Sequence, residues 1–358
     1  MTLEELRQQI DLIDNQMLQL LNQRMEIVKE VGNLKRTTNT VIYRPEREKS
    51  IIDRLTEHSK GKLLNRSAIE AIYLEIFAVS RNLELPERIS FLGPEGSFTH
   101  QAAESRFGAM SDYISLPSIR SVFESVDTGR VRFGVVPIEN NREGIVNETI
   151  DLLYELDIRI VAEVLLPIHH TFATKTEKLS DIKNIYSKDI AFRQCQKFLN
   201  EYFDITKVKL IPIESTSKAA RIAATEPNSA AICSHIAAKL SEVPILFENI
   251  EDGQYNRTRF FIISKDFKNQ KSGQDKTTII VDLPVSEKPG SLASFLQDFN
   301  EKQINLTKIE SRPTKADEKF QFWFYIDFDG HIEDENVQKI MQKHQSHVKW
   351  LGSYVKLS

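Results

Sequence analysis

The apolar positions at the start of the chain recur in steps of three and four residues. This spacing predicts one amphipathic helix about 50 Å long, because each helical residue adds about 1.5 Å and no Gly or Pro interrupts the pattern before Gly32. Two more helical stretches, at about residues 46 to 59 and 66 to 85, precede Pro86. Residues 1–86 are therefore predicted to form an all-α domain. Its first helix is marked by these apolar residues: Leu3, Leu6, Ile10, Ile13, Met17, Leu20, Ile27, Val31 and Leu34.

After residue 87 the pattern changes to short β-branched runs that alternate with helical stretches. The first runs are RISFLG, YISLP, FGVVPIE and IRIVAEVLL, the alternation resumes after Pro167, and a last run, TRFFIIS, follows much later. Such alternation is typical of an α/β domain. We expect residues 87–266 to form two α/β lobes, with the chain crossing between them twice and a ligand cleft at their junction.

The segment KNQKSGQDK is polar and contains glycine, so it is predicted to be a linker. The rest of the chain, residues 275–358, shows strands and helices in the order βαββαβ. That order is the ferredoxin-like plan of an α+β domain.

Composition narrows the class of protein. The 358 residues are 41% hydrophobic and 27% charged, as in a soluble globular protein, and the net charge of −4 comes without a basic stripe for nucleic acid. The polar start MTLEELRQQ and the lack of a long apolar run predict neither a secretory signal nor a membrane span. Two cysteines, Cys195 and Cys233, are too few for a disulfide framework and fit a reducing compartment. We expect a cytoplasmic protein with no metal.

A basic residue, Arg24, interrupts the apolar positions of the first helix. A guanidinium that faces a core needs an anion, because an isolated buried charge is costly to desolvate. Lys35 follows eleven residues later, on the same helical face, whereas Arg7 precedes Arg24 by seventeen residues, about 25 Å. If all three cations serve one small ligand, Arg7 must come from a second chain, which predicts an intertwined dimer. The alternative is that these are solvated or salt-bridged helix charges.

The stretch LRQQIDLIDNQMLQLLNQRMEIVKEVGNLK, followed by RPERE, resembles the all-helical class of chorismate mutase. The resemblance implies that Arg7, Arg24 and Arg47 hold the two carboxylates of chorismate. It implies that Lys35 bonds the ether oxygen that departs in the rearrangement, and Glu48 the ring hydroxyl. The reaction is intramolecular and needs no cofactor, so cations that fix the compact conformer and stabilise the developing charge suffice.

Two positions of the helical region depart from that family. Glu84 stands where many relatives carry glutamine, and it shares a helical face with Ser80, which we expect to contact the substrate. An ionised Glu84 would repel the ether oxygen, whereas a protonated one would donate to it. Arg44 stands where an aspartate is often found.

Five short motifs occur in order in the α/β region: GPEGSF, PIENN, PIHH, ESTS and NRTRF. The first places Gly96 and Ser97 between a strand and a helix, where backbone N–H groups can face an anion. There is neither a Walker lysine nor a GxGxxG motif, which disfavours nucleotide cofactors. Together the motifs resemble prephenate dehydratase over about residues 88–265, with Thr258 and Arg259 as the central pair. The resemblance implies that further residues line this cleft or lie near it: Glu139, Asn140, His170, Ser215 and Thr216.

Dehydration of prephenate couples loss of CO₂ to departure of the ring hydroxyl, so the enzyme must anchor carboxylates and deliver a proton. Arg259 suits the first task, because it is permanently charged and can bind a carboxylate through two bonds. Thr258 is expected to donate a hydrogen bond to the leaving hydroxyl. The proton itself can come from water, His170 or Glu139, and the sequence does not choose. Two positions depart from the family pattern: Asn141, where serine is usual, and Lys188.

The stretch KPGSLASFL and the later ESRP resemble the ACT domain of prephenate dehydratases. The resemblance implies that phenylalanine binds between paired domains and inhibits by feedback; a plain dimerisation module is the alternative. The residues expected at this effector site are Gly290, Ser291, Leu292, Glu310, Ser311 and Arg312.

Taken together, these resemblances are to the bifunctional chorismate mutase/prephenate dehydratase family, or P-proteins, of phenylalanine biosynthesis. They imply a dimer or tetramer, a dehydratase fold like that of periplasmic binding proteins, and no cofactor. Two alternatives stay open. One is a monofunctional dehydratase whose helical domain only dimerises, and the other is a non-enzymatic binding protein that responds to an amino acid.

Overall fold

The computed structural model describes residues 2–38, 44–84, 88–109, 111–204, 206–253, 255–283, 289–314 and 322–356. The chain forms two compact units. The helical unit comprises Met1–Glu87 and Ser105–Asp112, and the mixed unit comprises Arg88–Glu104 and Tyr113–Ser358. Among the described residues, no helix is long and apolar enough to cross a membrane.

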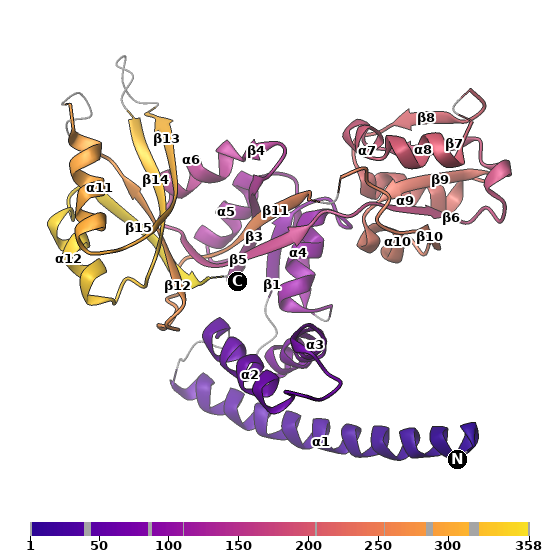
Figure 1. The fold of residues 1–358 in the computed structure, drawn as a ribbon, viewed down its shortest axis with the longest axis horizontal. Coiled ribbons are helices and arrows are strands. Elements are labelled where there is room, and N and C mark those ends of the chain that lie inside the picture. The colour runs from indigo at the N-terminus through magenta and orange to yellow at the C-terminus, as the bar shows by residue number, and fades with distance from the viewer. Residues whose placement is uncertain are drawn as a thin grey trace. The chain divides into compact units, whose positions relative to one another are not determined.

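The helical unit contains α1 (Leu3–Thr38), α2 (Pro45–His58) and α3 (Arg66–Glu84), as the sequence predicts (Figure 1). Pro45 occupies the first turn of α2, where its missing N–H costs nothing. At Gly32 a Cβ would lie 2.9 Å from the Cα of Glu84. Glycine therefore allows the backbones of α1 and α3 to approach closely beside the predicted mutase residues.

Most of the apolar face of α1 is exposed. Most of its large apolar side chains are exposed, with exposed fractions from 39% at Val31 to 66% at Leu34, whereas Leu21, Met25 and Val28 are partly buried. The small core of this unit is instead formed by α2 and α3, through Ile52, Ile69 and Phe77. An exposed apolar stripe of this length marks an interaction surface rather than a solvated one.

The mixed unit begins with two α/β lobes, as predicted. The first lobe has a sheet in the order β2-β1-β3-β11-β5, with β4 paired to β3, and the second has the order β10-β6-β9-β7-β8. The chain passes from β5 to β6 and returns from β10 to β11, so two crossings connect the lobes (Figure 1). The elements of the first lobe are β1 (Arg88–Leu92), α4 (Phe98–Phe107), β2 (Asp112–Leu116), α5 (Ile119–Asp127), β3 (Phe133–Asn140), β4 (Gly144–Ile145), α6 (Asn147–Glu155), β5 (Arg159–Pro167) and β11 (Arg257–Ser264).

The second lobe has a separate hydrophobic core, centred on Phe172, Ile185 and Ile232. Serine residues cap two of its helices: the side chain of Ser215 accepts from Lys218 N at the start of α9, and that of Ser234 accepts from Ala237 N at the start of α10. The elements of this lobe are β6 (Thr171–Thr174), the 3-10 turn η1 (Leu179–Asp181), β7 (Asn184–Ser187), α7 (Asp189–Gln194), α8 (Gln196–Tyr202), β8 (Lys209–Pro212), α9 (Thr216–Thr225), β9 (Ser229–Cys233), α10 (His235–Leu240) and β10 (Ile245–Phe247).

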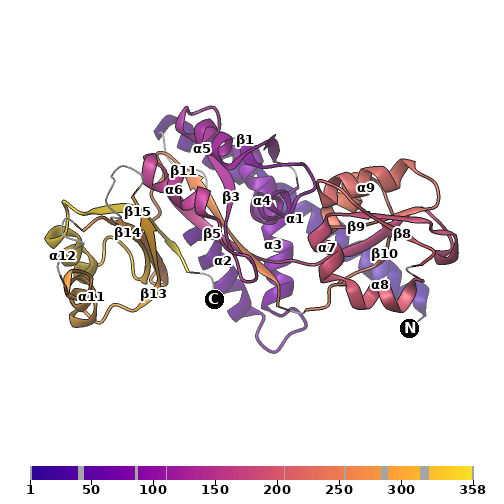
Figure 2. The same ribbon diagram turned by 90° about the horizontal axis from the view of Figure 1, so that it is seen from above.

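The C-terminal domain is an antiparallel sheet in the order β13-β14-β12-β15 with two helices on one face (Figure 2). The helices pack on this sheet through residues such as Phe295, Phe299 and Phe328. Its elements are β12 (Asp275–Val281), α11 (Ser291–Glu301), β13 (Leu306–Pro313), β14 (Phe322–Asp329), α12 (Glu335–Lys343) and β15 (Val348–Val355).

The other face of this sheet is buried against the first lobe. Tyr325 and Tyr354 share one hydrophobic core with Val136 and Phe261 of the first lobe. At Gly352, a Cβ would lie 2.1 Å from the carbonyl oxygen of Ile160, so β15 can approach β5 this closely only with glycine at that position. The C-terminal domain is thus a packed part of the mixed unit.

Candidate active sites

In the helical unit, two predicted cations of α1 meet two predicted residues of α3. The guanidinium of Arg24 donates to Ser80 Oγ at 2.5 Å, and Lys35 Nζ lies 2.6 Å from Glu84 Oε2. Ser80 and Glu84 are buried, with exposed fractions of 6% and 8%. The structure therefore gathers these four residues at the contact between α1 and α3.

Glu48 is held by a residue that the sequence analysis does not single out. The guanidinium of Arg81 donates to a carboxylate oxygen of Glu48 and, at 2.8 Å, to the carbonyl oxygen of Arg106. Both side chains are largely buried, 9% exposed for Arg81 and 12% for Glu48. Arg81 directly follows Ser80, so its place next to a predicted site residue is the only sequence signal for it.

Three other predicted arginines, Arg7, Arg44 and Arg47, do not contact the cluster of Arg24, Lys35, Ser80 and Glu84. Arg7 and Arg47 are exposed, and Arg44 lies 3.5 Å from Glu46 in an ion pair. Because α1 is one continuous helix (Figure 1), Arg7 stays about 25 Å from Arg24 along its axis. Within one chain, Arg7 cannot contact a ligand that is bound at Arg24.

In the first lobe, Thr258 is held by an asparagine from the neighbouring strand. Asn140 Nδ2 donates to Thr258 Oγ1 at 2.8 Å and to Asn256 Oδ1 at 2.9 Å, while Asn140 Oδ1 accepts from the backbone N–H groups of Arg142 and Glu143. Both polar atoms of the Asn140 side chain thus have hydrogen-bond partners within the protein. Thr258 Oγ1 accepts the bond from Asn140, so its own hydrogen can point at a ligand.

Arg259 and Glu139 lie on the other face of this sheet. Arg259 Nη2 is 3.2 Å from Glu139 Oε2, and Nη1 is 2.9 Å from Asp327 Oδ2 in the C-terminal domain. The expectation that both residues line one cleft with Thr258 is not met. The physical reason is that adjacent residues of a strand point to opposite faces.

His170 lies where the chain enters the second lobe and is 3% exposed. Its Nε2 is 2.9 Å from Gln194 Oε1, and its backbone N–H donates to Glu251. Burial lowers the pKa of His170 below its ordinary value, so the ring is neutral near pH 7. With Nε2 donating to Gln194, Nδ1 is an acceptor, and it has no partner among the described residues.

The turn that contains Gly96 and Ser97 differs from the anion cradle that the sequence predicts. Gly96 N donates to His100 Nδ1, and Ser97 N to the carbonyl of Pro94, so both amides are used within the protein. Gly96 instead contacts the second lobe, because its carbonyl accepts from Ser234 Oγ at 2.6 Å. A buried hydroxyl at the N-terminus of α9, Ser217 Oγ, has no partner among the described residues.

Of the two departures from the family pattern in the lobes, Asn141 has a structural role. Asn141 Oδ1 accepts from Arg257 N at 3.0 Å, and its amide donates to the carbonyl of Tyr255. These bonds tie the end of β3 to the segment that leads into Thr258. Lys188 lies at the N-cap of α7 without a capping bond from its side chain.

The expected effector residues fall into two groups. Gly290 has φ +91° at the start of α11, a conformation that favours glycine, with Ser291 and Leu292 directly after it. On β13, Arg312 bonds instead to Asp151 and Asn147 of α6, at 2.9 and 2.7 Å, and Glu310 shares its strand face. Within one chain, α6 therefore holds the guanidinium of Arg312, and the effector site expected between paired domains stays a prediction. Ser311 is exposed.

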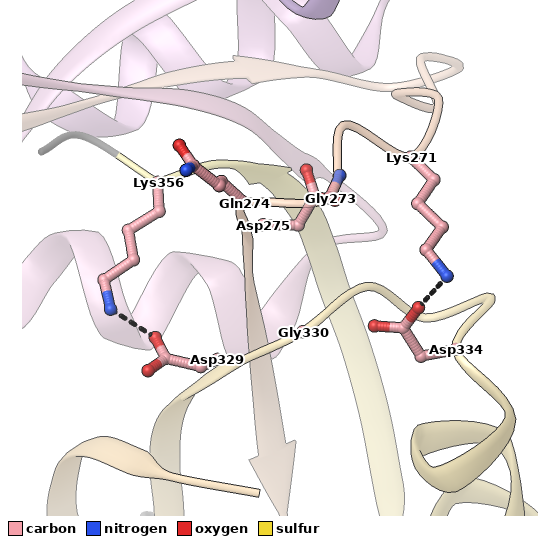
Figure 3. A pocket seen from close by; sticks show the side chains of 8 residues that line it. All are labelled: Lys271, Gly273, Gln274, Asp275, Asp329, Gly330, Asp334 and Lys356. Carbon is pink, nitrogen blue, oxygen red and sulfur yellow. Dashed lines mark hydrogen bonds and ion pairs between the residues drawn. The ribbon is translucent and has the colours of Figure 1, made fainter.

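A pocket of about 620 Å³ opens at the end of the C-terminal sheet where β12 begins and where β14 and β15 end (Figure 3). Its charges pair with one another: Lys356 lies 2.7 Å from Asp329, and Lys271 pairs with Asp334. Asp275 is held by Ser272 and Gly273. Within the described part of the chain, no group of three or more His, Cys, Asp or Glu side chains is placed to hold a metal ion.

Comparisons with known proteins connect these clusters to two enzyme families. Residues 6–85 match the family model of chorismate mutase type II, and residues 89–268 match that of prephenate dehydratase. The bifunctional chorismate mutase/prephenate dehydratase of Aquifex aeolicus is 38% identical over 99% of this chain and 98% of its own length. Its counterpart in Pseudomonas aeruginosa is 37% identical over the same shares.

Among solved structures, the prephenate dehydratase of Arthrobacter aurescens in complex with L-Phe covers 75% of this chain and 90% of its own, with a TM-score of 0.66 and 33% identity. The prephenate dehydratase of Staphylococcus aureus covers 75% and 99%, with a TM-score of 0.63 and 27% identity. The chain therefore belongs to the bifunctional chorismate mutase/prephenate dehydratase family, with the mutase in its N-terminal helices and the dehydratase in the two lobes that follow.

Proposed function

We propose that the helical unit rearranges chorismate in a pocket that two chains complete, and that the two-lobed region converts the resulting prephenate to phenylpyruvate under control by phenylalanine. The observation that carries the first part is the cluster of Arg24 and Lys35 with Ser80 and Glu84 at the contact between α1 and α3. The second part rests on Thr258, whose oxygen is oriented by Asn140.

In the mutase site, cations do the work. Arg24 holds a carboxylate of chorismate, and Lys35 donates to the ether oxygen as the C–O bond breaks, which stabilises the developing negative charge. Glu84 lies beside Lys35 and aims its ammonium group. Glu48, fixed by Arg81, accepts from the ring hydroxyl. No step requires a nucleophile, because the rearrangement is intramolecular.

A second copy of the chain completes this site. Two facts support that proposal: the apolar face of α1 is exposed along its length, and Arg7 is too far from Arg24 to share a ligand within one chain. Antiparallel pairing of two α1 helices would bury the apolar stripe and bring Arg7 of one chain to Arg24 and Lys35 of the other.

Complementation between two inactive variants tests the shared site. Arg7→Ala and Lys35→Met should each lose most mutase turnover, yet subunits mixed by co-refolding should regain activity. Each mixed dimer then has one site in which Arg7 and Lys35 are both present, so about a quarter of all sites are intact if pairing is random. Mutase turnover is measured before and after mixing. No gain on mixing, with mixed dimers shown to form, would mean that Arg7 and Lys35 act in the same chain or not at all.

In the dehydratase site, Thr258 donates a hydrogen bond to the departing ring hydroxyl. Asn140 fixes the threonine, and His170 contributes an acceptor at Nδ1 rather than a proton, because its ring is neutral. Both carboxylate oxygens of Glu139 accept hydrogen bonds from cations. We therefore assign water as the source of the proton, which reaches the departing hydroxyl through Thr258. The N-terminus of α9 then receives a carboxylate, with Ser215, Thr216 and the hydroxyl of Ser217, which has no partner among the described residues.

The C-terminal domain, residues 275–358, is proposed to be an ACT domain of ferredoxin-like plan, following a mutase domain at 1–86 and a dehydratase domain at 87–266. The strand order β13-β14-β12-β15 supports this. Phenylalanine would bind at the turn of Gly290, Ser291 and Leu292, where a Cβ added at Gly290 meets no atom of the described residues within 4 Å. The dehydratase relative from Arthrobacter aurescens was solved with L-Phe.

Chorismate supplied to the purified enzyme tests this division of labour. We expect prephenate to form at the same rate with and without phenylalanine, while phenylpyruvate formation falls and prephenate accumulates when phenylalanine is present. The two products are followed separately, with tyrosine as the control amino acid. Equal phenylpyruvate formation at saturating phenylalanine would contradict the proposed regulation.

A further inference from the structure

Six charged side chains form a net-neutral cluster where the C-terminal sheet meets the first lobe. Arg259 is at its centre, with Asp327 at 2.9 Å, Glu139 at 3.2 Å and Glu163 at 3.4 Å. Two lysines of the C-terminal domain extend it: Lys308 lies 2.6 Å from Glu139, and Lys276 lies 2.8 Å from Glu163. We call this set the Arg259 cluster: Glu139, Glu163, Arg259, Lys276, Lys308 and Asp327.

Most members of the Arg259 cluster are buried, and Glu139, with a side chain 34% exposed, is the most exposed of them. Asp327 is 1% exposed and Glu163 4%, and the side chain of Arg259 is 12% exposed. Thr278 Oγ1 also donates to Asp327 at 2.7 Å and so fixes its carboxylate. Removing one member of such a cluster leaves an uncompensated charge with little water to solvate it, so the remaining members must move.

Two members of the Arg259 cluster are chain neighbours of the groups that form the dehydratase site. In the pairing of β11 with β3, Arg259 stands opposite Glu139, and Thr258 stands opposite Asn140. Each strand therefore presents one residue to the C-terminal domain and the next to the opposite face. A shift of Arg259 or Glu139 moves the backbone on which the Thr258–Asn140 hydrogen bond is built.

We propose that Arg259 is a positioning residue of the dehydratase site, and that Asp327 and Lys308 of the C-terminal domain hold it and its partner Glu139 in the geometry that aims Thr258. Both terminal nitrogens of the Arg259 guanidinium contact carboxylates of the protein, which is the arrangement of a structural clamp rather than of a substrate anchor. The inference rests on the proposed role of Thr258.

The clamp gives the C-terminal domain a direct route to catalysis. Its strand β14 supplies Asp327 and its edge strand β13 supplies Lys308, so a displacement of this sheet pulls on β11 and β3 together. The route consists of contacting residues with defined partners and needs no long chain of intermediates.

Substitution of the clamp residues that lie in the C-terminal domain tests this proposal. Asp327→Asn keeps the size of the side chain and removes the charge that pairs with Arg259. Lys308→Met removes the charge that pairs with Glu139, at a less buried position. Each should lower dehydratase kcat about tenfold and leave KM for prephenate within about twofold, because the aim of Thr258 is disturbed while substrate binding is not. Mutase turnover of the same protein reports that the chain is folded.

Lys349→Met is the matched control. Lys349 is a cation of the same interface that donates to the carbonyls of Leu153, Tyr154 and Leu156 and does not belong to the Arg259 cluster. It should leave dehydratase kcat unchanged. An equal loss in Lys349→Met would mean that loosening the interface as a whole, and not the clamp, lowers turnover, and the proposal would be overturned.

A double-mutant cycle separates this proposal from the role of Thr258 itself. If Asp327 acts through Thr258, then Thr258→Val with Asp327→Asn should be no slower than Thr258→Val alone. Additive losses would overturn the clamp and leave Thr258 in place. Full turnover in Thr258→Val alone would remove the proposed role of Thr258 instead. If Asp327→Asn does not fold, the same cycle with Lys308→Met decides.

Discussion

Replacing Thr258 by valine should lower dehydratase turnover about a hundredfold and leave mutase turnover unchanged. Valine keeps the shape of the side chain but removes the hydroxyl, which accepts from Asn140 and which we propose donates to the leaving group. The loss should fall on kcat, because the interaction strengthens only as the ring hydroxyl departs.

Thr258→Ser is the matched control, since it keeps the hydroxyl and removes only a methyl group. It should retain most dehydratase turnover. Steady-state rates with prephenate and with chorismate, measured on the same preparation, give both activities. Similar turnover in the valine variant and the natural enzyme would exclude Thr258 from the chemical step.

Replacing Lys35 by methionine should lower mutase turnover by a factor of about 10² to 10³, with the dehydratase unaffected. Methionine keeps the length and apolar character of the stem but cannot donate to the ether oxygen in the transition state. The change also removes the ammonium group that pairs with the buried carboxylate of Glu84, which is 8% exposed.

Lys29→Met tests whether any lost charge on α1 has this effect. Lys29 is on the same helix but is exposed. Its replacement should leave mutase turnover within about twofold, as expected for a surface substitution. Equal losses in both variants would point to general electrostatics or to helix pairing rather than to a specific role for Lys35.

The sequence predicts the architecture well where the signal is periodic. The steps of three and four residues gave α1, and the alternation of β-branched and helical stretches gave the two lobes. Arg24 was recognisable because a cation interrupted an otherwise apolar face, and the structure gives it a buried partner in Ser80. These features are local, and local pattern is what a single sequence records.

The site geometry depends on contacts that the sequence does not record. Asp327 is 68 residues from Arg259 in the chain, and neither residue type predicts the other. In contrast, the sequence does predict that Thr258 and Arg259 point to opposite faces, because side chains alternate along a strand. The family resemblance, which pairs the two residues in one cleft, obscured this prediction. The turn at Gly96 shows a further limit, because a glycine-rich turn that packs against another lobe has the same sequence as one that binds an anion.

Mixing two variants that each lack one of the two activities tests whether the chain contains two separate active sites. Given chorismate, Thr258→Val should accumulate prephenate, Lys35→Met should convert almost none, and neither should make phenylpyruvate at an appreciable rate. An equal mixture of the two proteins should produce phenylpyruvate readily, because prephenate from one is consumed by the other. Phenylpyruvate from the mixture no faster than the sum of the separate rates, with free prephenate present, would contradict the account.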